Sequence, residues 1–183
     1  MLFCIFLPGV ARTQSVETGL LKYPLAANGF KNLKLGEFTK LIPVYRLVYM
    51  DGNDKPDTDS CYRYIYEDNN ILGLADGITL NKVGFRTYKT QIAEIYLFFR
   101  HEDGYKVLKD FVANYGSWNS RPTDFTYIWE IGDVSLSLCY KDDLELGVAI
   151  FSSKKMQQLI QQYSIRTAAI QRAIATSLSI AGN

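Results

Sequence analysis

The fold is decided by the stretch ITLNKVGFRTYKTQIAEIYLFFR, which runs from Ile78 to Arg100. Within it, Val83 and Phe85 alternate with polar neighbours, as expected of a strand that buries one face. Lys89–Thr90 interrupts the pattern, and the following segment 92–99 carries apolar or aromatic residues on both of its faces. A strand of that kind is typical of the centre of a sheet. The stretch therefore predicts two neighbouring strands, of which the second is central.

Further strands are predicted on both sides of this stretch, because runs of aromatic and β-branched residues alternate with clusters of turn-forming residues. The polar loop DGNDKPDTDS (51–60) separates the first two runs, and Gly132–Asp133 forms a two-residue hairpin turn between the next two. The last run would complete an antiparallel meander. The five runs are 44–50, 61–67, 125–131, 134–140 and 146–151.

A helix over 103–115 is predicted by apolar side chains that recur at i, i+3 and i+4. Asp103 is the expected N-cap, and Gly116 supplies the left-handed stop. We expect the apolar face to pack against a sheet that contains strands 92–99 and 134–140. That face consists of Tyr105, Leu108, Phe111, Val112 and Tyr115.

A shorter helix is predicted over 36–42, between Gly36 and Pro43. Both halves would then contain a helix followed by antiparallel strands, which indicates a helix-plus-meander pseudo-repeat; such units are common, so coincidence is the alternative. Together the elements predict an α+β fold, an antiparallel sheet with helices packed on one face. With 183 residues and 48% apolar content, one domain over 15–152 is expected.

The charge of the chain is nearly balanced, with 20 Lys and Arg against 19 Asp and Glu. Nucleic acid is therefore not an expected partner, because binding to phosphates needs a concentrated basic surface. No apolar run approaches the about 20 residues that cross a bilayer, so no transmembrane segment is expected.

The N-terminus resembles the end of a secretory signal. The apolar run LFCIFL (2–7) is followed by the breakers Pro8–Gly9 and by the polar stretch 12–15. Residues 1–14 are therefore predicted to be a signal peptide, and the mature protein to be exported, either periplasmic or secreted. No basic residue precedes the run, as though a longer signal began upstream. A hydrophobic first strand of the mature fold is the alternative.

Removal of the signal would leave two cysteines, Cys61 and Cys139. Export would permit them to pair if their Cα atoms come within about 7 Å, and two free thiols are the other reading. The chain has no C-x-x-C pair and a single histidine, His101, so no metal-binding residue is assigned. The same composition suggests no catalytic and no cofactor-binding residue, and no cofactor is expected. The oxygen-rich loop 51–60 lacks the spacing of a familiar calcium loop.

The tail 153–183 contains four basic residues and no Asp or Glu. Apolar residues recur along it at steps of four and three, which predicts a basic amphipathic helix. Three roles stay open: a cover for the acidic body, a device for binding a protein partner or a second copy, and contact with an anionic membrane surface. The stripe consists of Met156, Ile160, Tyr163, Thr167, Ile170, Ile174 and Leu178, with the polar Thr167 as its one break.

The region from Tyr105 to Tyr140 resembles small exported bacterial proteins to which no function is assigned. The resemblance rests on the helix end Asn114–Gly116, the strand Tyr127–Trp129 and the alternation in Val134–Leu138, and it covers about the last two thirds of the chain. It implies an exported protein and brings no catalytic residues with it. At the level of fold, the two helix-plus-meander halves also look like the tandem modules of the β-lactamase-inhibitor type.

These observations favour a non-catalytic exported module of the cell envelope or exterior, which presents an aromatic sheet face or the C-terminal helix to a protein partner. The alternative is a carboxylate-based enzyme, a hydrolase of unfamiliar type, that uses Glu94, Glu130 or Asp133 on or beside the sheet. Two carboxylates that converge in an enclosed pocket would favour the enzyme, and a shallow aromatic surface would favour the binding module.

Overall fold

The computed structural model describes residues 28–50, 61–74, 77–141 and 145–181, with side chains up to residue 170 and at residue 172. The predicted signal peptide and the loop 51–60 lie outside these residues. The described part of the chain forms one large antiparallel sheet, a small hairpin and two α-helices, so the predicted α+β fold is confirmed.

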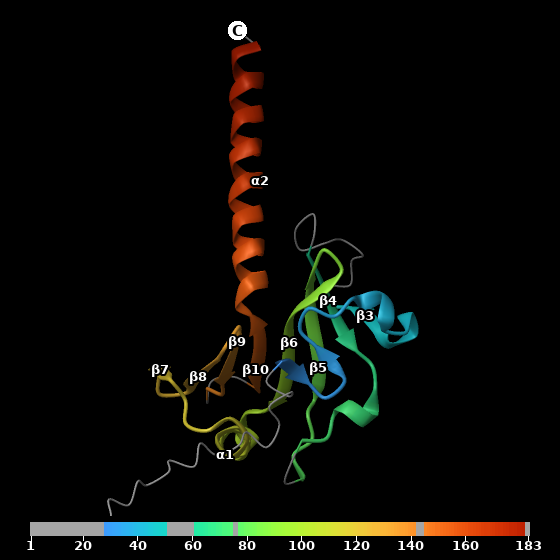
Figure 1. Cartoon of the computed structure of the whole chain (residues 1–183), viewed down its shortest axis with the longest axis vertical. Helices are drawn as coiled ribbons and strands as arrows, with labels where there is room; N and C mark the ends of the chain where they lie inside the picture. The colour runs from blue at the N-terminus through green and yellow to red at the C-terminus, as the bar shows by residue number, and fades with distance from the viewer. Residues whose placement is uncertain (1–27, 51–60, 75–76, 142–144, 182–183) are drawn as a thin grey trace, which may run out of the picture.

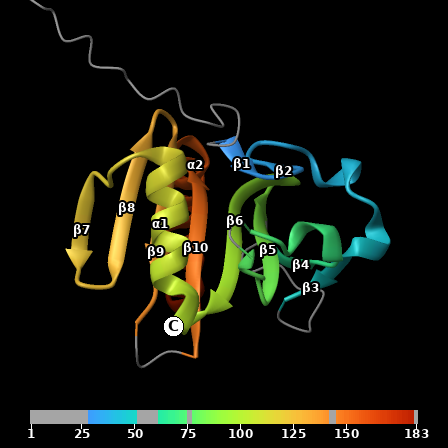
Figure 2. The same ribbon diagram turned by 90° about the horizontal axis from the view of Figure 1, so that it is seen from below.

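The large sheet has eight strands in the order β3-β4-β5-β6-β10-β9-β8-β7 (Figures 1 and 2). Two four-stranded meanders, one from each half of the chain, are joined by pairing of their last strands, β6 and β10. The strands are β3 (Leu47–Tyr49), β4 (Cys61–Tyr66), β5 (Lys82–Tyr88), β6 (Gln91–Arg100), β7 (Ser120–Thr123), β8 (Thr126–Ile131), β9 (Val134–Cys139) and β10 (Leu146–Ser153).

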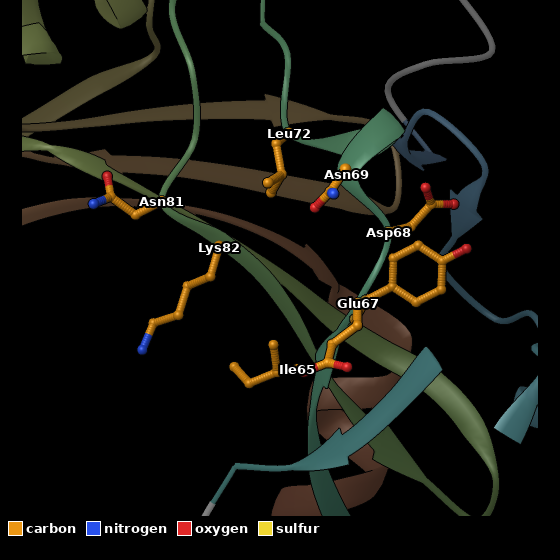
Figure 3. Close-up of a pocket in the computed structure, with 8 residues that line it drawn as sticks. Ile65, Glu67, Asp68, Asn69, Leu72, Asn81 and Lys82 are labelled. Atoms are coloured by element: carbon orange, nitrogen blue, oxygen red, sulfur yellow. The ribbon is translucent and has the colours of Figure 1, made fainter. Parts of the chain in front are cut away.

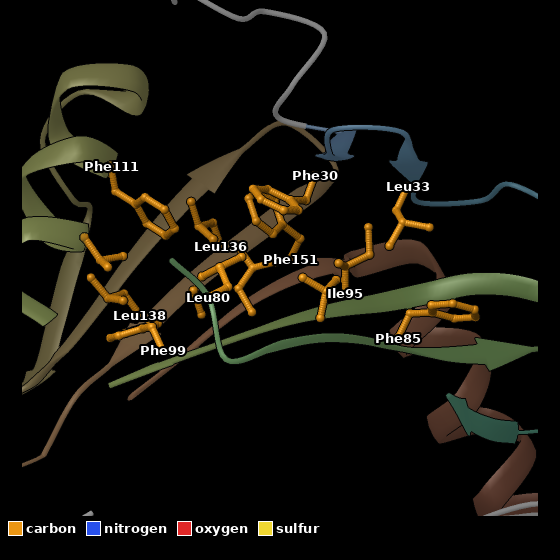
Figure 4. Packing of buried hydrophobic residues seen from close by; sticks show 14 of the residues in the cluster. Phe30, Leu33, Leu80, Phe85, Ile95, Phe99, Phe111, Leu136, Leu138 and Phe151 are labelled. Atoms are coloured by element: carbon orange, nitrogen blue, oxygen red, sulfur yellow. The ribbon is translucent and has the colours of Figure 1, made fainter. Parts of the chain in front are cut away.

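One face of the sheet is covered by α1 (Gly104–Tyr115) and by the hairpin of β1 (Gly29–Phe30) and β2 (Leu33–Lys34). Figure 4 shows Phe111 of α1 and Phe30 of the hairpin pointing into the layer of sheet side chains around Phe151. The ring of Phe111 lies 5.9 Å from that of Trp129 and 6.4 Å from that of Phe151. The main core is therefore an aromatic and aliphatic layer on this face of the sheet.

The helix predicted over 103–115 is present, but it is turned slightly from the expected orientation. Leu108 and Phe111 are buried as expected, whereas Tyr105 is 64% exposed and Val107 is buried in its place. Asp103 is not a side-chain cap, because its carboxylate instead binds Arg100 and Lys106.

The predicted helix over 36–42 is wrong. This segment holds only a 3₁₀ turn, Thr39–Leu41, and a second such turn, Val44–Arg46, precedes β3 and shortens the strand expected there. The amide of Gly36 donates to the carbonyl of Ile92 at 2.7 Å, and the amide of Thr39 donates to that of Thr90 at 2.9 Å. These bonds fix the segment to the β5–β6 hairpin, so the helix of the predicted pseudo-repeat is found in the second half alone.

The C-terminal helix α2 (Lys154–Ala181) rises from the sheet on the side opposite α1 (Figure 1). Met156 and Ile160 in its first turns are buried against Cys61 and Tyr88, in a second, smaller core cluster. Beyond these turns the helix extends past the sheet (Figure 1). In the described part of the chain, no helix has the length and apolar character needed to span a membrane.

The two cysteines do not pair, and both are free thiols. Cys61 begins β4 and Cys139 ends β9, and three strands separate β4 from β9 in the sheet. At about 4.8 Å per strand this separation is far beyond the reach of a disulfide. The free-thiol reading is therefore the correct one.

Candidate functional site

Of the three carboxylates considered for an enzyme, Glu94 lies far from Glu130. Glu94 lies on β6, Glu130 on β8, and Asp133 in the turn between β8 and β9. Strands β10 and β9 separate β6 from β8, which places Glu94 and Glu130 about 14 Å apart at the usual strand spacing. Glu94 and Glu130 therefore could not share one substrate as general acid and base.

Glu94 is a structural anchor at the foot of α2. It is mostly buried and accepts hydrogen bonds from the hydroxyl of Tyr96 and, at 2.6 Å, from the side-chain amide of Gln157. The guanidinium of Arg86 lies 3.7 Å from the same carboxylate. Burial, together with the charge of Glu94, raises the pKa of Tyr96 above its ordinary range. The cluster therefore ties the first turn of α2 to the centre of the sheet.

Glu130 makes a second tie to α2. Its carboxylate pairs with the ammonium of Lys154 and accepts a hydrogen bond from Ser135 at 3.0 Å. The bond to Lys154 is the main reason that the pKa of Glu130 lies below its ordinary value, and Ser135 adds to the effect. The amide of Lys154 also donates to the carbonyl of Asp133 at 2.8 Å. The helix thus begins in a fixed place and direction.

A hollow of about 470 Å³ lies between the end of β4 and the start of β5. Two of its charged groups, Asp68 and Lys82, do not interact with each other. Asp68 forms an ion pair with Arg46 at 2.7 Å and points away from Lys82 in Figure 3. Asp68 also accepts the amide of Asn70 at 3.0 Å. Asp68 and Lys82 therefore do not form an acid–base pair in the hollow. It is lined by Ile65, Tyr66, Glu67, Asp68, Asn69, Leu72, Asn81 and Lys82.

His101 is half-buried in the 3₁₀ turn His101–Asp103 before α1. Among the residues that the structure describes, no three His, Cys, Asp or Glu side chains are grouped so that they could hold a metal ion. The aromatic residues of β3, β4 and β5 pack mainly on one another: the ring of Tyr64 lies 4.9 Å from that of Tyr49 and 5.2 Å from that of Phe85.

Helix α2 carries three of the exposed large apolar side chains of the described chain. Leu159 is 40% exposed, Ile170 is 52% exposed and Ile165 is 64% exposed. Ile170 belongs to the apolar stripe whose first members, Met156 and Ile160, are buried on the sheet, and Leu159 lies beside this stripe. The same side of the helix therefore has a covered beginning and an uncovered continuation.

Two basic residues accompany these apolar side chains. Lys155, Leu159, Arg166 and Ile170 follow one another at steps of four, seven and four residues, about one, two and one helical turns. They form one side of α2, which we call the basic edge, and all four are exposed. Of the four residues of the basic edge, only Ile170 belongs to the apolar stripe predicted for the tail. Apolar periodicity gives no weight to cations, so it does not predict the basic edge.

No family model, no curated protein and no solved structure matches this chain.

Proposed function

We propose that the protein is a non-catalytic binding module that presents α2 to a protein partner. The proposal is carried by one observation: α2 is packed on the sheet only in its first turns and continues past it, with Ile170 exposed on the side of the helix where Met156 and Ile160 are buried. A single helix without tertiary contacts is only marginally stable in water. An uncovered apolar stripe on such a helix is the usual mark of a surface that a partner covers.

The foot of the helix supports this proposal. Ser153 accepts the amide of Met156 at 3.3 Å, as an N-cap does, and Gln157 and Lys154 bind Glu94 and Glu130 on two different strands. A helix held at its base in a fixed direction loses less conformational freedom when a partner binds. The sheet would hold the base of α2 in a fixed position and orientation for the partner.

We place this function outside the cytoplasm, in the envelope or the exterior, on the strength of the apolar run 2–7 and the breakers after it. The carboxylate-based hydrolase has no observation in its favour, since Glu94 and Glu130 each hold α2 and lie on separate strands.

Site-specific photo-crosslinking in the source cells tests the proposal. A photoreactive amino acid replaces Ile170 in the full chain, and the control carries it at Tyr105 of α1, which is exposed to a similar degree. We expect a discrete crosslinked protein adduct from position 170 and none from position 105. Equal patterns from both positions, or no adduct at 170, would contradict the proposal.

A further inference from the structure

We infer that the partner presents an acidic amphipathic helix, which packs along the basic edge of α2. This inference rests on the proposed function and adds the chemistry of the partner. Lys155 and Arg166 alternate with Leu159 and Ile170 along about 22 Å of helix, at the rise of 1.5 Å per residue. A helix with apolar residues at the same intervals and carboxylates between them would match the edge in shape and in charge.

Among the residues that the structure describes, no carboxylate explains the charge of the edge. Lys155 lies in the first turn of α2, where the helix dipole favours an acidic residue and this helix has none. Lys154, its neighbour, is neutralised by Glu130, but no carboxylate among the described residues forms an ion pair with Lys155 or Arg166. Both cations are exposed and available to an external carboxylate.

A second copy of the chain fits this surface less well. Every charged residue between 153 and 183 is basic, so two α2 helices side by side would bring like charges together. A membrane surface is also less suited, because only two cations lie on the edge and each contributes about 1 kcal/mol near anionic lipid. The alternation of apolar and basic side chains along one helix favours a helical protein surface.

The experiment uses the full chain and a synthetic peptide as the probe. The peptide is a helix of six turns with leucines at the spacing of the edge and glutamates beside them, and its charge-swapped form carries lysines in place of the glutamates. Binding is followed by fluorescence anisotropy. We expect the acidic peptide to bind and the basic peptide not to bind.

A matched pair of variants tests the site. Lys155→Gln with Arg166→Gln removes two positive charges from the edge, and Gln158→Glu with Gln161→Glu changes the net charge equally at exposed positions elsewhere on α2. We expect the first pair to weaken binding of the acidic peptide about tenfold, since interface charge pairs act at short range, and the second pair to change it less than threefold. Circular dichroism checks that both variants keep the helix.

Several results would overturn the inference. It is wrong if both variant pairs weaken binding equally, if both peptides bind alike, or if the acidic peptide does not bind. It is also wrong if sedimentation shows that α2 forms dimers, or if α2 binds phosphatidylserine vesicles in preference to the peptide. Adducts from position 170 without peptide binding would leave the proposed function standing and reject only the acidic partner.

Discussion

At the scale of single residues, Phe111 is the side chain by which α1 is fixed to the sheet. It is 2% exposed, and its ring touches those of Tyr115, Trp129 and Phe151. We expect Phe111→Ala to lower the free energy of unfolding by about 3 to 5 kcal/mol, because it empties a buried aromatic site. Denaturant unfolding measures the change. Tyr105→Ala on the outer side of α1 is the control, and a similar loss in both variants would contradict this account of the packing.

The orientation of α1 is set by a glycine. A Cβ on Gly104 would lie 2.2 Å from the ring of Tyr140, so the helix approaches the sheet closely only without one. Gly104, Val107, Leu108 and Phe111 therefore form the buried side. Apolar periodicity in the sequence favours Tyr105 instead, because it counts large apolar side chains and gives glycine no weight. The existence of the helix could be predicted from the sequence, and its rotation could not.

The ion pair between Glu130 and Lys154 should make stability depend on pH. The folded protein lowers the pKa of Glu130 below its ordinary value of 4.5, so the charged carboxylate is favoured by folding. The stabilisation is full above pH 4.5 and is lost as the pH falls through the lowered pKa. We expect Glu130→Gln to lower the melting temperature at pH 7 and to have a vanishing effect at strongly acidic pH.

Thermal unfolding monitored by circular dichroism across this pH range tests the prediction. The pair is exposed, so high salt should also reduce the difference between variant and native protein at pH 7. A difference that persists unchanged at acidic pH would contradict a role for the charge of Glu130.

At the scale of elements, strands and helices with a strong local period could be predicted, and the segment 36–42 could not. Phe38, Leu41 and Ile42 have helical spacing, yet the chain there is fixed by bonds from Gly36 and Thr39 to the β5–β6 hairpin. These partners lie more than 50 residues away in sequence. Short segments have few local interactions, so long-range bonds of this kind override their periodicity.

The candidate site could be predicted only in part, because only some of its features have a local period in the sequence. The tail is basic and periodic along its own sequence, so a helix there was expected, and α2 confirms it. The anchors of α2 cannot be predicted from the sequence, because Gln157 meets Glu94 across 63 positions of the chain. Polar residues that meet only after folding leave no periodic signal in the sequence.

We predict that α2 divides into an integral part and a projecting part. Met156 and Ile160 are buried, and the ring of Tyr163 lies 6.2 Å from that of Tyr88, whereas Ile165 is 64% exposed and the distal part of α2 extends past the sheet (Figure 1). Truncation after Ser164 should leave the melting temperature nearly unchanged.

Truncation after Phe151 is the comparison. It removes Met156 and Ile160 and exposes the sheet residues that they cover, at about 1.5 to 3 kcal/mol for each large apolar side chain. We expect this shorter chain to lose its cooperative thermal transition. Loss of the transition already in the chain that ends at Ser164 would show that the distal helix belongs to the core, and it would remove the main support for the proposed function.

At the scale of the whole molecule, the seam between β6 and β10 joins the two meanders into one sheet. It runs from the pair Arg100–Leu146 to the pair Glu94–Ser152. Near the Arg100–Leu146 end, a Cβ on Gly147 would lie 2.2 Å from the ring of Phe99, so this glycine leaves room for the aromatic ring across the seam. Each of the two strands is hydrogen-bonded on both sides. The seam should therefore open only when the whole sheet unfolds.

Hydrogen-exchange rates should therefore differ most between the amides of β6 and β10 and the amides of the distal part of α2. The amides of β6 and β10 should exchange slowest, at a rate set by global unfolding, and those of α2 beyond Ser164 fastest among the helices, because no described tertiary contact protects them. Addition of the acidic helical peptide should slow exchange in the distal part of α2 and leave β6 and β10 unchanged. Mass spectrometry of peptic fragments resolves these segments. If the distal helix is as protected as β6 in the dilute, free protein, some other surface already covers it, and its exposed stripe is not the place where a partner binds.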